Sequence, residues 1–168
     1  TLKSGTKILV SNKKTKKIII DEYNVMQEKI SIVPNGVNLS MFNITKKKNP
    51  KKVVFAGAMY YHRGLDVLLE TIPLVIEKIP DAKFVLLGSG TEMDKLKEIV
   101  SKNKLDNSVE FKGWIEREKI PENIADASIG IGPLRLTEVT SRALPIKVLE
   151  YMAVSLPLIA QKGTLPND

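Results

Sequence analysis

The spacing of apolar positions changes repeatedly after residue 50, and each change predicts a new element. Short apolar runs predict buried strands at residues 53–56, 83–87, 109–111, 128–131 and 158–160. After Gly64, apolar residues recur three and four positions apart until Pro80, which predicts an amphipathic helix. Further helices are predicted at residues 92–102, 117–125 and 145–153. Because strand and helix alternate, we expect an α/β fold in which helices cover both faces of a parallel sheet.

The chain before residue 52 has a different pattern. Strands are predicted at residues 7–10 and 29–33, with a basic helix between them at residues 12–23. The second strand ends at the turn signal Pro34-Asn35-Gly36, and residues 37–51 are predicted to form a polar, lysine-rich loop. A compact domain does not need so long a loop, so we expect the first segment to be the edge of another structural unit.

Lysine dominates the charge of the protein, which has a net charge of +7 and an isoelectric point near 9.5. Such a charge can favour nucleic acids, anionic lipids or phosphate-bearing ligands. The lysines form short runs, which are more typical of a solvated face than of a binding site. Because no aromatic residue lies within these runs, we expect no nucleic acid as a partner.

The remaining composition excludes several classes of protein. The 168 residues contain no cysteine and one histidine, which excludes disulfides, thiolate chemistry and a zinc site built on several imidazoles. No apolar run is long enough to span a membrane, and no secretory signal pattern begins the chain. These features fit a cytoplasmic protein.

Candidate chemistry lies in the loops that follow the strands, because open parallel sheets bind ligands at the carboxyl ends of their strands. The first loop, residues 57–64, has glycines at both ends and Arg63 just before a predicted helix. Glycine allows close backbone approach, while arginine and a helix N-terminus favour phosphate. An ordinary loop with a surface arginine explains the same residues equally well.

The second loop, Gly88-Ser89-Gly90, resembles the start of the dinucleotide fingerprint GxGxxG. Met93 stands where the third glycine would be, so a tight turn is the favoured interpretation. Thr91 is predicted to cap the helix that follows.

The third stretch, residues 141–153, contains a carboxylate in an apolar helix. Leu149, Met152 and Ala153 are expected to be buried, and Glu150 lies among them. A buried carboxylate needs a partner, which could be the diol of a ribose or Lys147 one turn earlier. Both interpretations remain open at this point.

Five stretches resemble motifs of a known family. They are Val33–Asn38 with Phe42, Phe55–Leu69, Phe84–Gly90, Val109–Gly113 and Leu149–Ala160. Their residues and order are similar to those of glycosyltransferase family 4, over nearly the whole chain. The resemblance implies the GT-B architecture, in which two Rossmann-like domains enclose a cleft. It also implies an enzyme that transfers a sugar, with retention, from a nucleotide diphosphate sugar.

The resemblance implies donor-binding roles for Gly57, Arg63, Gly64, Ile115, Ile146, Lys147 and Glu150. Arg63 takes the place of the family lysine that contacts the diphosphate, and the backbone N–H groups of Ile146 and Lys147 would face the same phosphates. Glu150 matches the second glutamate of a paired motif, which binds the ribose. Ile115, next to Trp114, would lie near the base.

The resemblance also predicts how the chain is organised. Residues 1–36 would be a remnant of the N-terminal domain with the interdomain crossing, and residues 37–168 a C-terminally incomplete donor-binding domain. The catalytic residues are expected in the missing N-terminal domain, so the fragment is expected to be inactive alone. Neither a metal nor another cofactor is expected. The expected partners are the nucleotide-sugar donor, a carbohydrate or lipid-linked acceptor and, through the lysines, the cytoplasmic face of a membrane.

Several positions depart from the family pattern. Ala58 replaces an arginine, Arg142 replaces the first glutamate of the pair, and Pro145 replaces a glycine. Lys147 is a candidate to replace the lost positive charge, and His62 is interpreted as a loop surface residue. The alternatives are therefore a glycosyltransferase-like protein without activity and a Rossmann-type nucleotide-binding module.

Overall fold

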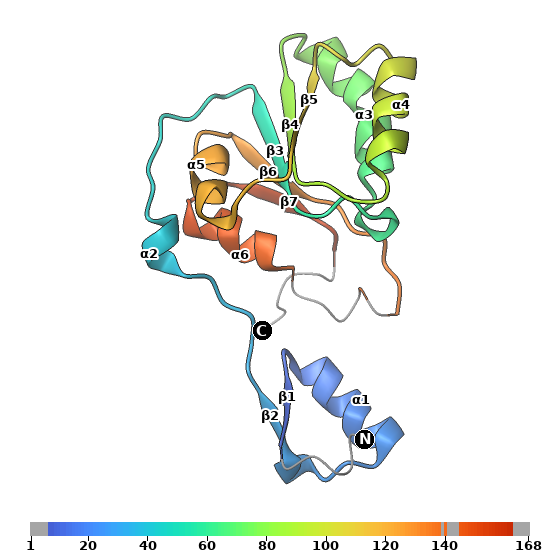
Figure 1. Cartoon of the computed structure of the whole chain (residues 1–168), viewed down its shortest axis with the longest axis vertical. Helices are drawn as coiled ribbons and strands as arrows, with labels where there is room; N and C mark the ends of the chain where they lie inside the picture. The colour runs from blue at the N-terminus through green and yellow to red at the C-terminus, as the bar shows by residue number, and fades with distance from the viewer. Residues whose placement is uncertain (1–6, 139, 141–144, 163–168) are drawn as a thin grey trace.

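The computed structural model describes residues 7–138, 140 and 145–162. Its main sheet has five parallel strands in the order β5-β4-β3-β6-β7 (Figure 1). These strands are β3 (Lys52–Ala56), β4 (Lys83–Leu87), β5 (Val109–Gly113), β6 (Ile129–Gly132) and β7 (Leu158–Ala160). The observed sheet confirms the predicted α/β fold with all five strands in place.

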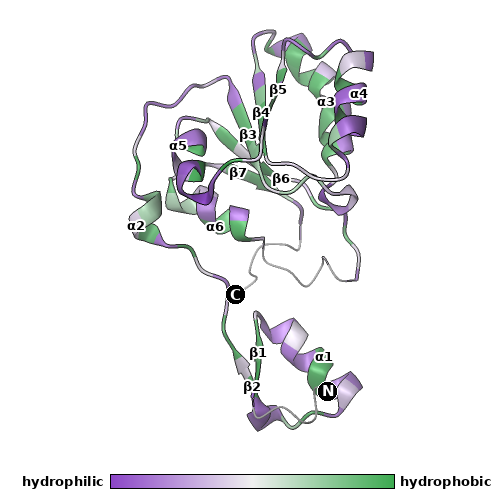
Figure 2. Ribbon diagram, in the orientation of Figure 1, coloured by the Kyte–Doolittle hydropathy of each residue, from purple (hydrophilic) through white to green (hydrophobic). Residues whose placement is uncertain are grey.

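Helices cover both faces of this sheet because alternate strand residues point to opposite sides. Phe55 and Leu86 pack with α3 (Leu65–Lys78) and α4 (Met93–Lys102). Val54 and Leu87 pack on the other face with α2 (Leu39–Phe42), α5 (Ile120–Ile124) and α6 (Ile146–Ala153). Figure 2 shows the result, with hydrophobic strands in the centre and a largely hydrophilic outer surface on α4.

A second, small sheet precedes the main one. Strands β1 (Ile8–Val10) and β2 (Ile30–Ile32) pair in parallel and pack with α1 (Lys13–Tyr23). The Asn12 side chain caps α1 by accepting from the Thr15 N–H, and the 3-10 turn η1 (Gln27–Lys29) leads into β2. This unit has its own small cluster of buried apolar residues, Val10, Val25 and Ile30.

Two local predictions were wrong. The predicted loop at residues 37–51 contains the short helix α2, whose Phe42 is buried in the main core and whose N-cap is Asn38. Thr91 does not cap α4, because the cap position is Glu92 and its side chain makes no capping hydrogen bond. The Glu92 N–H instead donates to the Met59 carbonyl of a neighbouring loop, so tertiary contact replaces the local cap.

Helix α6 turns a different face inward from the one predicted. Met152 is 61% exposed, and Leu149 and Ala153 are only half-buried. The buried side chains are instead Lys147, Val148 and Tyr151. The Tyr151 hydroxyl accepts a hydrogen bond from the Ala56 N–H at 2.9 Å and donates to the Ile131 carbonyl at 3.3 Å, which ties α6 to the ends of β3 and β6.

Candidate functional site

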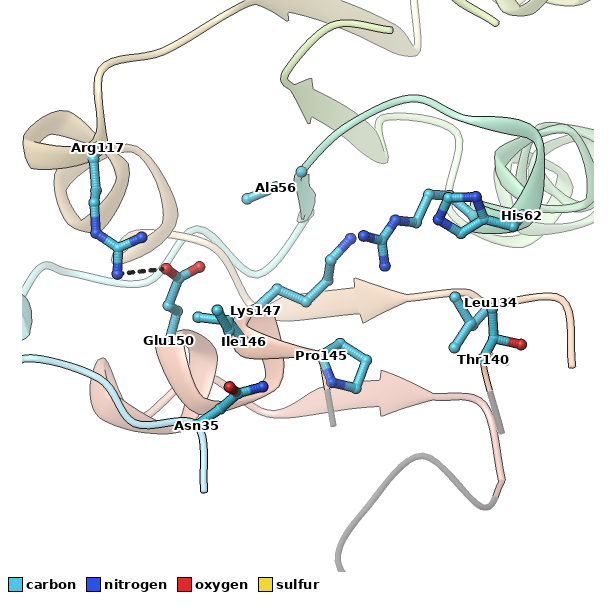
Figure 3. Close-up of a pocket in the computed structure, with 12 residues that line it drawn as sticks. Asn35, Ala56, His62, Arg117, Leu134, Thr140, Pro145, Ile146, Lys147 and Glu150 are labelled. Carbon is cyan, nitrogen blue, oxygen red and sulfur yellow. Dashed lines mark ion pairs between the residues drawn. The ribbon is translucent and has the colours of Figure 1, made fainter. Parts of the chain in front are cut away.

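A pocket of about 480 Å³ lies where β3 and β6 end and α6 begins (Figure 3). Its lining comes from Asn35, Ala56, Gly57, His62, Arg63, Arg117, Leu134, Thr140, Pro145, Ile146, Lys147 and Glu150. This is the edge at which parallel sheets bind ligands. Five of the seven predicted donor-binding residues therefore meet in one place, namely Gly57, Arg63, Ile146, Lys147 and Glu150.

The other two predicted residues do not line the pocket. Gly64 ends the 3-10 turn η2 (Tyr61–Arg63) in a left-handed conformation, with φ of 64°, and starts α3. Ile115 packs against the core cluster under α5 and α6, and Trp114 beside it is exposed. The ligand roles of these residues remain predictions.

The loop that carries Arg63 is held in place by Arg135. The Arg135 guanidinium binds both carboxylate oxygens of Asp66 at 2.8 and 2.7 Å and donates to the Tyr61 carbonyl at 2.9 Å. It also lies over the Tyr61 ring, 4.3 Å from the centroid. Because arginine binds a carboxylate and stacks on an aromatic ring at once, Arg135 fixes η2 against the start of α3.

The Gly88-Ser89-Gly90 segment packs against the backbone of the same loop. A Cβ atom on Gly88 would lie 2.1 Å from the Gly57 carbonyl oxygen, and one on Gly90 would lie 2.3 Å from the Met59 carbonyl oxygen. Both glycines are therefore explained by close backbone packing. None of the three residues lines the pocket, which favours the tight-turn interpretation over a dinucleotide fingerprint.

Two cationic side chains in the pocket have buried nitrogens without a hydrogen-bond partner among the described residues. These atoms are Arg63 Nε and Lys147 Nζ. Lys147 is only 7% exposed, and its Nζ lies 3.6 Å from the centroid of the Phe55 ring. Burial lowers the pKa of both residues, and the nearby Arg63 charge lowers the pKa of Lys147 further. A buried cation without a partner is costly, so an anion bound in this pocket would stabilise the charged forms of both side chains.

Glu150 faces the same pocket with only 12% of its side chain exposed. Its carboxylate lies 3.7 Å from the Arg117 guanidinium. Burial raises the pKa of Glu150, while Arg117 and Lys147 lower it. The internal ion pair between Glu150 and Lys147 is not formed, so this interpretation of the sequence was wrong.

The structure adds pocket residues that the sequence analysis missed. Arg117 is on the 3-10 turn η3 (Arg117–Lys119), and Asn35 belongs to the segment that joins the two sheets. His62 was interpreted as a surface residue but lines the pocket, and its pKa is lowered first by burial and then by Arg63 and Lys147. The sequence signal that could have placed His62 in the pocket was its position next to Arg63.

Two features are absent from the described parts of the chain. Within them, no group of three or more histidine or acidic side chains could hold a metal ion. None of the described helices has both the length and the apolar character needed to cross a membrane. Arg142 lies outside the described residues, and Ala58 contributes no charge to the loop.

Comparison with known proteins identifies the family. The family model described as "Glycosyl transferases group 1" matches residues 50–167. The chain belongs to this family. As a group 1 glycosyl transferase it has the α/β half of a GT-B fold, in agreement with the resemblance stated from the sequence.

Curated relatives share about a quarter of their aligned residues with the chain. It is 28% identical over 172 residues to the Escherichia coli UDP-Gal:alpha-D-GlcNAc-diphosphoundecaprenol alpha-1,3-galactosyltransferase, covering 94% of this chain and 43% of the relative. It is 26% identical over 148 residues to one component of the Arabidopsis thaliana phosphatidylinositol N-acetylglucosaminyltransferase, covering 83% and 32%. The chain thus spans less than half the length of these relatives.

Solved structures agree on the fold. The pneumococcal O-GlcNAc transferase GtfA, in complex with UDP and GlcNAc, matches with a TM-score of 0.76 at 20% identity. This match covers 94% of the present chain and 30% of GtfA. A glycosyltransferase from Rickettsia africae matches with a TM-score of 0.74 at 20% identity, over 94% and 45% of the two chains.

Proposed function

We propose that the pocket binds the nucleoside diphosphate part of a nucleotide-sugar donor, and that the chain is the donor-binding half of a retaining glycosyltransferase. One observation carries the proposal. Among the described residues, Lys147 Nζ and Arg63 Nε are buried nitrogens without a hydrogen-bond partner, and they lie in a single pocket with the Glu150 carboxylate. A ligand with adjacent phosphates and a ribose would satisfy both kinds of group at once.

The start of α6 adds to this demand for an anion. The helix begins at Ile146 after Pro145, and its cap position makes no side-chain hydrogen bond. The first N–H groups of a helix have no intrahelical acceptor and, with the helix dipole, favour a phosphate. The N–H groups of Ile146 and Lys147 therefore complete the proposed diphosphate site, and stabilisation of the leaving diphosphate would be its contribution to catalysis.

The base of the donor and the second substrate extend beyond this pocket. We propose that the ribose binds Glu150, and that the base lies toward Ile115. Residues 1–36 would belong to the N-terminal half that supplies the acceptor site and the catalytic residues. The relatives named above, of which the chain spans 32% and 43%, act on lipid-linked substrates by their names, which supports a carbohydrate or lipid-linked acceptor.

Calorimetry of the chain with UDP, GDP and ADP tests the proposal. We expect at least one of them to bind. Arg63→Ala should weaken that binding by roughly 1.5–3 kcal/mol, the range for a hydrogen bond to a charged group, and should weaken nucleoside binding far less.

Lys97→Met is the matched control, because it removes a charge from the exposed surface of α4. It should leave the affinity unchanged. Absence of binding by all three nucleotides at millimolar concentration would reject the donor site. Equal losses for nucleotide and nucleoside in Arg63→Ala would show that Arg63 acts through the fold.

A further inference from the structure

Lys147 is the least expected residue of the pocket. Its side chain extends from the first turn of α6 toward the loop that carries His62 (Figure 3). It lies on the buried face of α6, beside Val148 and Tyr151, where an apolar side chain would normally stand. The Nζ atom nevertheless lines the pocket and has no hydrogen-bond partner among the described residues. Packing alone therefore does not explain a lysine at this position.

The groups around Lys147 disfavour the charged form of its amine. Arg63 and His62 face it from η2, and Arg117 faces the same pocket from η3. Of the described residues that line this pocket, Glu150 on α6 is the one acidic group, and its ion pair is with Arg117. The Phe55 ring offers only a cation–π contact. Burial and the Arg63 charge thus hold the pKa of Lys147 well below its ordinary value.

Gly57 leaves the space that Lys147 occupies. A Cβ atom at residue 57 would lie 2.8 Å from Nζ, and the backbone there has φ of 149°. The glycine thus lets the amine reach the end of β3, beside the Arg63 loop. A cationic group brought to this point meets any anion that enters the pocket.

We propose that Lys147 binds the diphosphate through its side chain, and that nucleotide binding is coupled to uptake of one proton by the Lys147 amine. The inference rests on the proposed function, because it concerns the same pocket. The proton comes from solution and joins the nitrogen lone pair, and the resulting ammonium donates to a phosphate oxygen. No covalent bond to the ligand forms or breaks.

The uptake follows from linkage between charge and binding. Without ligand, burial and the Arg63 charge disfavour the charged form of the amine, whereas a diphosphate at hydrogen-bond distance favours it. A ligand that raises the pKa of a group makes the protein bind protons. The affinity for nucleotide should consequently fall as the pH rises from about 7 to about 9, above the phosphate pKa of ~6 and below the ordinary lysine pKa of ~10.4.

Calorimetry of the chain with UDP, GDP and ADP in two buffers of different ionisation enthalpy, at about pH 8 where the phosphates are fully ionised, measures the proton directly. The wild type should take up close to one proton per nucleotide. Lys147→Met should lose the uptake and bind roughly tenfold to a hundredfold more weakly, the range for a charged hydrogen bond. His62→Gln should keep the uptake, which separates Lys147 from the imidazole of the pocket, and Lys97→Met should resemble the wild type.

The outcomes separate this inference from the function on which it rests. Binding with uptake that disappears in Lys147→Met supports it. Binding without uptake, uptake that disappears in His62→Gln, or undiminished affinity in Lys147→Met overturns it and leaves the donor site intact. If no nucleotide binds the wild type, the proposed function and this inference fail together. If Lys147→Met does not fold, the pH profile of the wild-type affinity tests the inference instead. An affinity that does not fall between about pH 7 and about pH 9 overturns it.

Discussion

Lys147 and Glu150 lie one turn apart on α6, yet their surroundings give them different chemistry. Lys147 is buried beside Phe55 and has no acceptor among the described residues, whereas the Glu150 carboxylate reaches the edge of the pocket and meets Arg117. Burial acts on both, lowering the pKa of the lysine and raising that of the glutamate. Burial thus disfavours the charged form of each residue, and for Glu150 the Arg117 charge opposes this effect.

Glu150→Gln tests the ribose contact. The change removes the charge but keeps the size, and the ion pair that it breaks involves the half-exposed Arg117. We expect the melting temperature of the free chain to stay nearly constant, because the pair is long at 3.7 Å, Arg117 is half-exposed, and the substitution also removes the cost of burying a carboxylate charge. The thermal shift caused by nucleotide should largely disappear, and the variant should discriminate less than the wild type between ribose and deoxyribose nucleotides.

Glu122→Gln is the control for this prediction, since it breaks the exposed pair with Lys46 outside the pocket. It should preserve the full thermal shift. If Glu150→Gln melts much earlier while its nucleotide affinity persists, Glu150 is a structural residue and the ribose assignment is wrong.

At the scale of elements, the site depends on how one loop is attached to one helix. The η2 turn carries Arg63, and Arg135 joins this turn to Asp66 at the start of α3. The hydrogen bonds from Arg135 lower the pKa of Asp66. The stabilisation from this pair is therefore present above the ordinary carboxyl pKa and is lost as the pH falls through the lowered value.

Asp66→Asn should loosen this attachment. We expect a loss of about 1–2 kcal/mol in the free energy of unfolding near neutral pH, because the pair is bidentate but partly exposed. Nucleotide affinity should also fall, since Arg63 is no longer held at the pocket. Chemical denaturation and calorimetry measure the two effects.

Asp94→Asn is a matched control, because Asp94 also lies in the first turn of its helix but is exposed on α4. Its effects on stability and affinity should be small. Equal effects of the two substitutions would indicate that helix-dipole interactions, and not the Arg135 pair, explain the result.

For the whole molecule, the buried charge links the ligand site to global stability. A lysine with a lowered pKa binds fewer protons in the folded state than in the unfolded state. The free energy of unfolding therefore rises with pH between the lowered value and the ordinary value. The same residue that serves the site thus makes the ligand-free protein less stable near neutral pH.

Lys147→Met should consequently melt above the wild type near pH 7, by an amount equivalent to roughly 1–3 kcal/mol, the cost of an unsatisfied buried group. The difference should narrow as the pH rises toward the ordinary lysine pKa of ~10.4, because the amine then loses its proton in the unfolded state as well. Thermal denaturation over this pH range measures it. A lower melting temperature for Lys147→Met, or a difference independent of pH, would contradict the prediction.

The sequence by itself determined the succession of strands and helices along the chain from residue 50 onward, but not the order of the strands in the sheet. Hydrophobic periodicity is a local property, so residues 83–87 and 158–160 were predicted with the bounds that β4 and β7 have. The conformations of the glycine-rich loops also follow from local preference, whereas residues 34–36, predicted as a turn, have neither a turn nor a bend. Together with the motifs, these signals led to Arg63, Lys147 and Glu150, which the structure brings into one pocket.

Only the tertiary structure decided what those side chains meet. Glu150 pairs with Arg117, 33 positions earlier in the chain, and no local pattern connects the two residues. The buried face of α6 includes Tyr151 because its hydroxyl reaches the backbone of β3 and β6, while Met152 remains exposed. Within the described residues, the Lys147 amine has no hydrogen-bond partner; it lies against the Phe55 ring of β3, in space left open by Gly57. Partners and burial depend on contacts between distant segments, and these exist only once the sheet has brought them together.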